Sequence, residues 1–243
     1  MRIATPAELR AAYRRTTFCY LCGLALANTE TNDDHVFAKS IATPKDRRSP
    51  LILPVHVRCN TRASVLDGQA AELVGFLHGK IPHSRRRQLE YVAERPVAGR
   101  QSMAAVTGLN LDALVMRWLQ GFHAALYGEF LPSIPKTLFS CSGPFPFGHF
   151  DAATSRGHIE PSRQVHPSIV KAIRLNRLCN RLDGVSLYEG NCRFDCVWSS
   201  LDDGRPCALF ALDLYDWKRL GRTPLTPEHG CAGLYCPPTH RES

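Results

Sequence analysis

The sequence predicts an α+β protein in which short strands and amphipathic helices alternate along one chain. Residues 18–59 consist of short apolar stretches separated by polar or proline-containing turns, as expected for strands joined by loops. Residues 60–78 and 111–126 place apolar side chains three and four positions apart, the spacing of a helix with one buried face. With 44% hydrophobic and 21% charged residues, the 243-residue chain has the composition of a folded soluble protein.

A first helix is expected over residues 5–15. Thr5 can cap its amino end, Pro6 suits the first helical position, and Glu8 can reach back to complete a capping box. Residues 18–59 then predict two short strands within irregular loops.

A second helix is expected over residues 60–78, where the sequence Gly-Lys-Ile-Pro at 79–82 ends it. Residues 85–92 predict a further short helix. The strong amphipathic pattern of residues 111–126 predicts a long helix that ends near Gly128.

The carboxyl-terminal part of the chain is expected to mix loops, one helix and one hairpin. Prolines mark residues 131–136 as a linker, residues 140–165 are expected to be rich in loops, and residues 168–182 predict a helix. Alternating apolar residues over 192–198, a polar turn, and the apolar run 209–215 predict a β-hairpin.

Two pairs of potential metal ligands stand on either side of the expected strands. Cys19 and Cys22 are separated by two residues, and His56 and Cys59 have the same spacing. Together they supply a tetrahedral ligand set suited to structural Zn²⁺. A redox-active cysteine pair is the alternative for Cys19 and Cys22, but it would be expected within a βαβ pattern, which is missing here. Reduced thiols without a metal are the second alternative.

Between the two pairs, Asp34 and His35 stand at the start of an expected strand, and Asn60 directly follows Cys59 at the start of a helix. This order of a CxxC pair, Asp-His, and HxxC-Asn resembles the HNH endonucleases, in particular the zinc-containing branch with the ββα-metal fold that includes endonuclease VII. The resemblance covers roughly 40 residues. It is fairly specific, because several elements must keep their order and spacing.

The resemblance implies a metal-dependent endonuclease that hydrolyses phosphodiester bonds. His35 would be the general base for the attacking water, and Asp34 and Asn60 would hold a catalytic Mg²⁺ or Mn²⁺ ion. Cys19, Cys22, His56 and Cys59 would hold the structural zinc. Many relatives also have an asparagine at the start of the second strand, whereas this chain has Ser49, Pro50 and Leu51 around that point.

The uneven charge suggests that the front half meets a polyanion, and the family resemblance implies nucleic acid, with DNA as the expected partner. Residues 1–100 hold 16 Lys and Arg against 9 Asp and Glu, while residues 101–243 hold 14 against 13. A solvated surface without a partner explains the same charge equally well. The basic residues proposed to contact phosphates are Lys45, Arg47, Arg48, Arg58 and Arg62. The helix around Arg117 could also face DNA, although Trp118 and Phe122 are expected in the core.

These observations divide the chain into a zinc-stapled HNH module over residues 1–80 and a helical and β-hairpin region of undetermined role over residues 81–243. The leading hypothesis is a DNA endonuclease. A zinc-stabilised module that binds nucleic acid without cutting it is the alternative, and an adaptor whose back half binds protein is a weaker third. The sequence shows neither a membrane span nor an apolar secretory signal, so a cytoplasmic location is expected. It does not indicate an oligomeric state.

Overall fold

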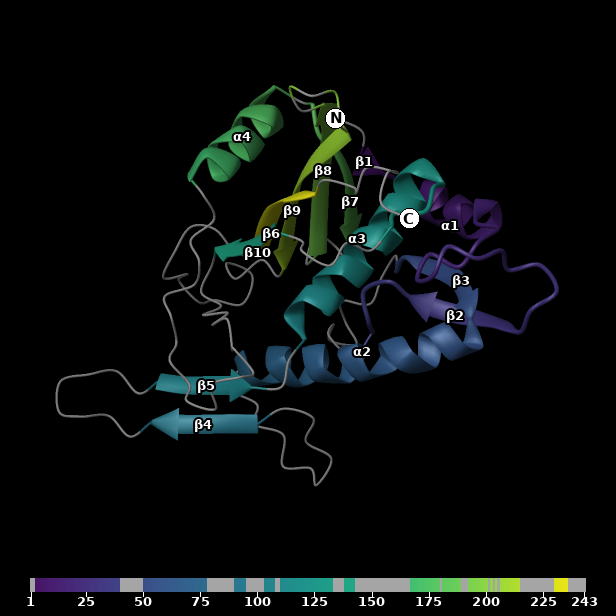
Figure 1. Ribbon diagram of the computed structural model, residues 1–243, viewed down its shortest axis with the longest axis horizontal. Helices are drawn as coiled ribbons and strands as arrows, with labels where there is room; N and C mark the ends of the chain where they lie inside the picture. Colours follow the sequence, from purple (N-terminus) through teal and green to yellow (C-terminus); the bar gives the residue numbers. More distant parts are fainter. Residues whose placement is uncertain are drawn as a thin grey trace.

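The computed structural model describes residues 3–39, 50–77, 90–94, 103–107, 110–132, 138–142, 167–179, 181–188, 192–200, 202, 204, 206–214 and 230–235. These residues form a mixed α+β structure, which confirms the predicted class. Figure 1 shows a small hairpin with its helices on one side, a larger sheet on the other, and helix α3 crossing between them.

Helix α1 (Pro6–Arg15) begins with the predicted capping box. The Thr5 hydroxyl accepts a hydrogen bond from the Glu8 backbone N–H, and the Glu8 carboxylate accepts one from the Thr5 backbone N–H at 2.8 Å. The helix buries Leu9 and Ala12 and leaves its charged side facing solvent. The sequence therefore predicts both the start and the extent of this helix correctly.

The hairpin consists of β2 (Thr31–His35) and β3 (Ile52–His56), which pair in antiparallel register and lead directly into α2 (Val57–Leu77). The two predicted strands are therefore confirmed. Helix α2 begins three residues before the expected start at Asn60. Asp34 and His35 lie at the end of β2, whereas the sequence placed them at the start of a strand, because the polar residues from Thr31 onward also pair with β3.

Helix α3 (Leu111–Tyr127) matches its prediction. The Asn110 side chain accepts a hydrogen bond from the Ala113 N–H at 3.0 Å, and Gly128 ends the helix in the left-handed region with φ 73°. Helix α4 (Pro167–Leu178) confirms the helix expected over residues 168–182 but ends four residues earlier. It packs against β9 and β10, two strands of the larger sheet.

The larger sheet has six strands in the order β1-β7-β8-β9-β10-β6, with all neighbours antiparallel except β1 and β7. The strands are β1 (Ile3–Ala4), β6 (Leu138–Ser142), β7 (Asp183–Leu187), β8 (Cys192–Ser200), β9 (Pro206–Leu214) and β10 (Gly230–Tyr235). The predicted hairpin is confirmed as β8–β9. Strand β6 overlaps the segment expected to be rich in loops, because its pairing partner β10 lies about 90 residues further along the chain.

The short helix expected over residues 85–92 is wrong for the part that the structure describes. Residues Glu90–Glu94 form strand β4, which pairs with β5 (Met103–Thr107). Tyr91 and Val92 favour strands, and the cross-strand partner stabilises a conformation that local helix preference does not predict. Residues 85–89 lie outside the described part of the chain.

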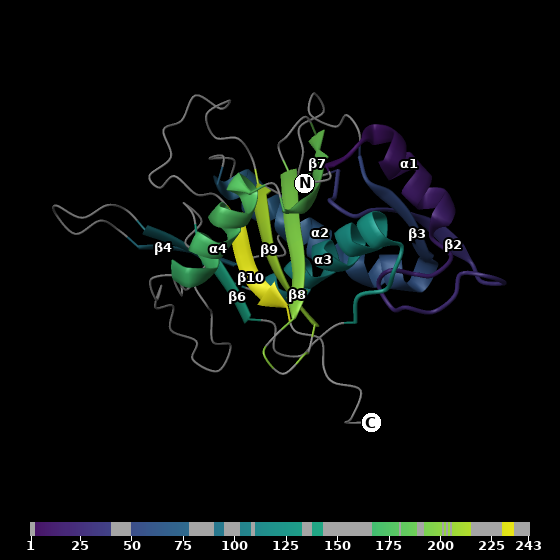
Figure 2. The ribbon, with the colours of Figure 1, turned by 90° about the horizontal axis from the view of Figure 1, so that it is seen from above.

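One hydrophobic cluster joins the hairpin, α1, α3 and the six-stranded sheet. It includes Leu9 of α1, Leu53 of β3, Phe122 of α3 and Leu212 of β9. Figures 1 and 2 both place α3 between the sheet and the unit formed by β2, β3 and α2. Packing is therefore continuous across the boundary that the sequence placed at residue 80. Among the described residues, no helix has the length and apolar character needed to cross a membrane.

Candidate metal centre and the adjoining polar site

The segment that carries Cys19 and Cys22 forms a tight turn that is held by backbone hydrogen bonds. The Leu24 carbonyl accepts from the Cys19 N–H at 2.8 Å, and the Cys19 carbonyl accepts from the Gly23 N–H at 2.7 Å. Gly23 has φ 78°, and a Cβ there would lie 2.8 Å from the ring of Phe130, just beyond α3. Glycine is thus required twice at this position, once for the turn and once for the contact with Phe130.

The four predicted ligands come together in space. The ligand atoms of Cys19, Cys22, His56 and Cys59 all lie within 4.8 Å of one another, so this cluster could hold a zinc ion. The Cys22 Sγ lies 3.4 Å from the His56 Nδ1, and the opposite ring nitrogen, Nε2, lies 3.1 Å from the Ala25 carbonyl oxygen. With the proton on Nε2, His56 donates to Ala25 and presents the Nδ1 lone pair to the cluster.

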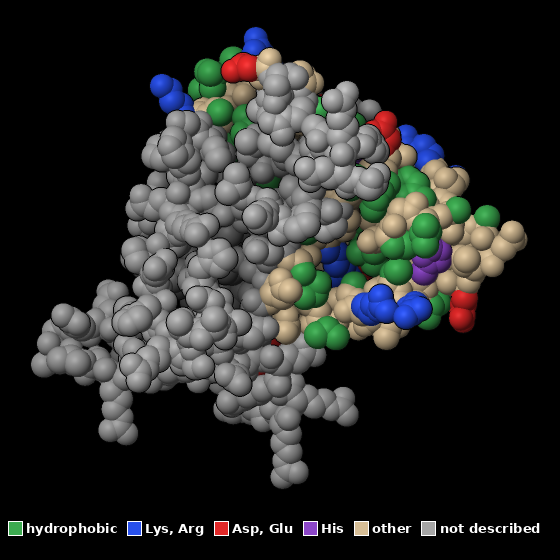
Figure 3. All heavy atoms as spheres, in the orientation of Figure 1, with side chains coloured by type: hydrophobic (Ala, Val, Ile, Leu, Met, Phe, Trp, Pro, Cys, Tyr) green, Lys and Arg blue, Asp and Glu red, His purple; other side chains and the backbone are tan. Residues whose placement is uncertain are grey.

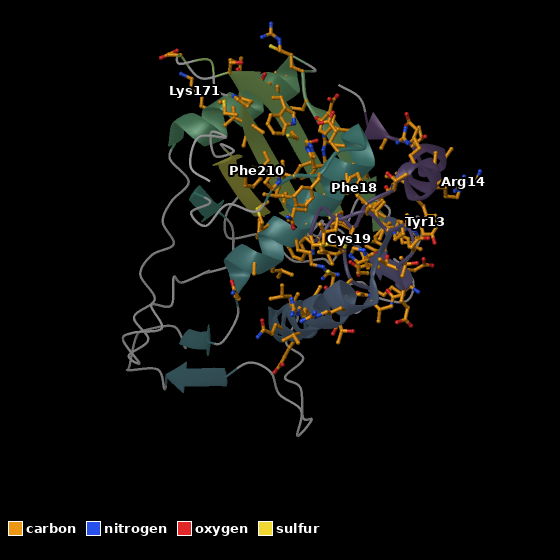
Figure 4. The ribbon with its side chains drawn as sticks, turned by 45° about the vertical axis from the view of Figure 1, so that its right-hand side comes forward. Tyr13, Arg14, Phe18, Cys19, Lys171 and Phe210 are labelled. Atoms are coloured by element: carbon orange, nitrogen blue, oxygen red, sulfur yellow. The ribbon has the colours of Figure 1, made fainter. Side chains whose placement is uncertain are left out.

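The thiols of this cluster are crowded enough to affect one another's ionisation. Burial, followed by the charge of Cys19, raises the pKa of Cys59 to about 12. Burial alone would also raise the pKa of Cys22, but hydrogen bonds from the Leu24 backbone and from His56 lower it overall. A bound cation would favour the thiolate form of all three cysteines, which is the form that binds zinc. Cys19 is buried, and Figure 4 shows it inward of Tyr13 and Arg14, which belong to helix α1.

Asp34 is buried and fully engaged by other residues. Asp34 is 4% exposed. The Arg117 Nη2 donates to Asp34 Oδ1 at 2.8 Å and to Oδ2 at 2.9 Å, and the Tyr20 hydroxyl donates to Oδ2. The Nη1 of Arg117 binds Asp67 of α2. Residues from two other segments, Tyr20 and Arg117, therefore donate to the oxygens of Asp34.

Asn60 lies in the first turns of α2 and donates from Nδ2 to Asn32 Oδ1 of β2. The two side chains proposed to hold a catalytic cation are thus engaged separately, Asn60 by Asn32 and Asp34 by Arg117 and Tyr20. Arranged in this way, Asp34 and Asn60 do not fit a divalent cation, because the carboxylate has no oxygen without a hydrogen-bond donor. A cation at Asp34 would have to replace one of these donors.

His35, the proposed general base, is partly buried at the end of β2. Burial, then the charge of Lys39, lowers its pKa, against smaller opposing effects of Asp34 and Asp33. The imidazole is therefore neutral near pH 7, as a general base must be. Among the described residues, its buried Nε2 finds no hydrogen-bond partner.

The proposed phosphate contacts are described only in part. Arg58 and Arg62 are exposed one turn apart on α2. Lys45, Arg47 and Arg48 lie outside the described residues. Figure 3 shows Lys and Arg side chains and a histidine reaching the surface over the hairpin and α2.

The DNA-facing role considered for Arg117 is wrong, because this residue is 2% exposed and pairs with two carboxylates. Trp118 and Phe122 lie in the core, as expected. The sequence does not reveal Tyr20 as a partner of Asp34, nor Asp67 as a second partner of Arg117. One signal in the sequence points to this network. Arg117 lies between Val115 and Trp118 on a helix whose neighbouring positions are almost all apolar. An arginine in such surroundings is rarely buried unless it has a buried partner.

Comparisons with protein-family models, with curated proteins and with solved structures find no match to this chain.

Proposed function

We propose that this protein is an HNH-type endonuclease that hydrolyses phosphodiester bonds in DNA, with structural zinc at Cys19, Cys22, His56 and Cys59. The proposal rests on one observation: the hairpin β2–β3 leads directly into helix α2, and the four potential zinc ligands cluster at the junction of β3 and α2. Zinc at this cluster would fix the turn after Cys19 to the junction of β3 and α2, and so hold β2 against that helix.

The lowered pKa of His35 supports a catalytic role. In the proposed reaction the neutral imidazole removes a proton from water as the water oxygen attacks the scissile phosphorus and the bond to the 3′ oxygen breaks. The pKa of His35 is lowered mainly by burial, so the neutral form is available at pH 7. Exposed Arg58 and Arg62 on the adjoining helix would bind phosphates and orient the strand.

The family resemblance adds a Mg²⁺ or Mn²⁺ ion on Asp34 and Asn60, which would neutralise charge on the phosphate and the departing oxygen. Both side chains are held by other residues in this structure, so no step of the proposed reaction is assigned to an ion on them.

A second candidate function is binding of nucleic acid without cleavage. The observation that favours it is the engagement of Asp34 by Arg117 and Tyr20, which leaves no oxygen of the carboxylate for a cation. The same zinc cluster and the same exposed arginines serve both functions. The two candidates therefore differ only in chemistry at the end of β2.

Supercoiled plasmid incubated with the full zinc-loaded chain separates the candidates. An endonuclease converts the plasmid to nicked and linear forms when Mg²⁺ or Mn²⁺ is added. A binding module retards the plasmid in a gel and leaves it intact. Binding in either case should weaken with rising salt, because phosphate contacts release counterions. Protein that neither retards nor cuts DNA would contradict both candidates.

A matched pair of variants tests the phosphate contacts. Replacing Arg58 and Arg62 together by Gln should weaken plasmid binding and reduce its salt dependence by up to about two units of slope. Replacing Arg181, an exposed arginine just after α4, should leave both unchanged. Equal salt dependence in all three proteins would contradict a phosphate-binding role for α2.

A further inference from the structure

Four polar side chains from four segments form a largely buried network beside the metal centre. Tyr20 comes from the loop between the ligand cysteines, Asp34 from β2, Asp67 from α2 and Arg117 from α3. The guanidinium bridges the two carboxylates, with Nη2 on Asp34 and Nη1 on Asp67. The network thus ties β2 to α3 at the residue immediately before His35.

The residue on the other side of His35 is held by the same helix. Val36 is buried, and its N–H donates to the Leu51 carbonyl at 3.1 Å. A Cβ on Gly121 would lie 2.3 Å from Cγ1 of Val36, so any larger residue there would force Val36 to move. Gly121 follows Arg117 by four residues, which places both on one side of α3. One face of α3 therefore holds the chain at both residues that flank His35.

The imidazole of His35 depends on this backbone for its direction. Among the described residues no hydrogen bond holds the ring, and its Nε2 is buried without a partner. Successive side chains of a strand point to opposite faces, so holding Asp34 and Val36 toward α3 directs the His35 side chain the other way. The Arg117 Nη2 also lies 3.5 Å from the His35 carbonyl oxygen.

The chemistry of the Arg117–Asp34 pair suits an anchor. Both residues are buried, and Nη2 of Arg117 donates to both oxygens of the carboxylate. Hydrogen bonds between charged groups are strong where water is excluded, so this pair resists displacement of the strand. The Tyr20 hydroxyl adds a donor to Oδ2, and Asp67 holds the other amino group of the guanidinium.

We propose that Arg117 and Asp34 are positioning residues, which together fix the strand before His35 and so set the direction of its imidazole. The inference rests on the proposed function for the catalytic role of His35. It assigns no cation to Asp34 and no contact with substrate to Arg117. Loosening the pair should therefore release the ring of His35 while the zinc centre and the fold remain.

Carbethoxylation by diethyl pyrocarbonate tests the position of His35 without any need for cleavage. Arg117→Lys keeps the charge, but a single ammonium lacks the fork that spans both carboxylates, and Asp34→Asn keeps the size with one acceptor oxygen fewer. Mass spectrometry of the full zinc-loaded chain gives the rate at each histidine. We expect His35 to react at least about fivefold faster in both variants, the scale of loosening a local contact. At pH 8 its imidazole, whose pKa burial lowers, is neutral in every variant, so the rate reports access to the ring.

The matched control is Arg193→Lys, the same change at an arginine that pairs with the buried carboxylate of Asp195 at 3.0 Å in the large sheet. Its His35 should react as in wild type. The buried His123 is an internal reference, and an unchanged rate there, with unchanged zinc content and melting, shows that a variant is folded. If Arg117→Lys is not folded, Asp34→Asn decides the test. An unchanged rate at His35 in the folded variants would overturn the proposal.

Plasmid cleavage separates a positioning role for Asp34 from a role as cation ligand. Both variants should lower kcat by about tenfold and leave KM for DNA unchanged, because neither residue touches DNA. Combining them should do no more than the larger single effect, since both disable one pair. Recovery of Asp34→Asn at higher Mn²⁺ concentration would overturn the proposal, because it would identify the carboxylate as a cation ligand.

Failure of this inference and failure of the proposed function give different results. Faster modification of His35 in the variants of a protein that does not cut plasmid supports the positioning role and contradicts the nuclease. Cleavage by wild type, with His35 modification and kcat unchanged by the substitutions, supports the nuclease and contradicts the positioning role.

Discussion

The carboxylate of Asp34 is held by residues 14 and 83 positions away in the sequence, Tyr20 and Arg117. Burial raises the pKa of the Tyr20 hydroxyl, and the charge of Asp34 raises it further, so the hydroxyl keeps the proton that it donates. Arg117 and Tyr20 thus supply donors to both oxygens of this carboxylate. At the scale of single residues, Asp34 therefore joins β2 to α3 through Arg117.

His123 provides a test of burial that is independent of the proposed function. Its ring lies 4.8 Å from that of Tyr127 and 5.4 Å from that of Trp198, and burial lowers its pKa to about 4. In the unfolded chain the pKa is about 6.5. Between these values the unfolded state binds more protons than the folded state, so stability is full above pH 6.5 and falls as the pH drops toward 4.

For wild type we expect the free energy of unfolding to fall by about 2 kcal/mol between pH 7 and pH 5 from this residue alone. His123→Phe keeps an aromatic ring and removes the site that binds the proton. The free energy of unfolding of this variant should therefore fall less over the same pH range, by that amount. Chemical denaturation at the two pH values measures both. Any loss of zinc in acid affects both proteins alike. The same pH dependence in both would contradict the burial of His123.

At the scale of elements, the ligand cluster joins the turn at Gly23 to the β3–α2 junction. Cys59→Ser should abolish tight zinc binding and lower the melting temperature, because structural zinc sites contribute much of the folding free energy of small modules. Cys179→Ser is the control, since this cysteine is exposed just after α4. Atomic emission should find one zinc per chain in wild type and control. Unchanged zinc content in Cys59→Ser would contradict the assigned ligands.

The contact between α3 and β2 leads to a second prediction at this scale. Gly121→Ala places a methyl group against Val36 and should destabilise the protein by about 1–3 kcal/mol, the usual effect of overpacking, although alanine favours helices. Val36→Ala removes the obstructing methyl groups, so the double variant should be more stable than the two single effects would give if added. Additive effects, measured by chemical denaturation, would contradict the close approach.

Sequence patterns predict those elements whose signals are local. The capping box at Thr5 and the apolar face of residues 111–126 each lie within one element, and both are confirmed. Strand β4 was missed because its conformation depends on pairing with β5. Strand β1 has only two residues and exists through its partner β7. Tertiary pairing therefore limits what the sequence shows of the sheet.

The same distinction applies to the site. The matched spacing of Cys19–Cys22 and His56–Cys59 predicts the four clustered ligands, because each pair is close in sequence and a shared metal requires their convergence. The partners of Asp34 could not be predicted in this way. Arg117 reaches Asp34 only because α3 docks against β2, and no local pattern encodes that docking.

At the scale of the whole molecule, the continuous core predicts that residues 1–80 do not fold alone. Leu53 of β3 and Phe122 of α3 belong to one buried cluster, and Asp34 would lose Arg117. A fragment of residues 1–80 should bind zinc but melt without cooperativity, since it would expose the apolar face that α3 covers. Calorimetry of the fragment and the full chain measures this. A cooperative transition in the fragment would show that the predicted boundary marks an independent domain.

The most direct test of the proposed function is plasmid cleavage by His35→Ala, measured beside wild type in the same Mn²⁺ buffer. His35 contributes no zinc ligand, so zinc content, melting temperature and DNA affinity should stay close to those of wild type. The cleavage rate should fall by about 10²-fold or more, the usual effect of losing a general base. If His35→Ala cuts DNA as fast as wild type, the catalytic assignment fails, and binding without cleavage becomes the better account.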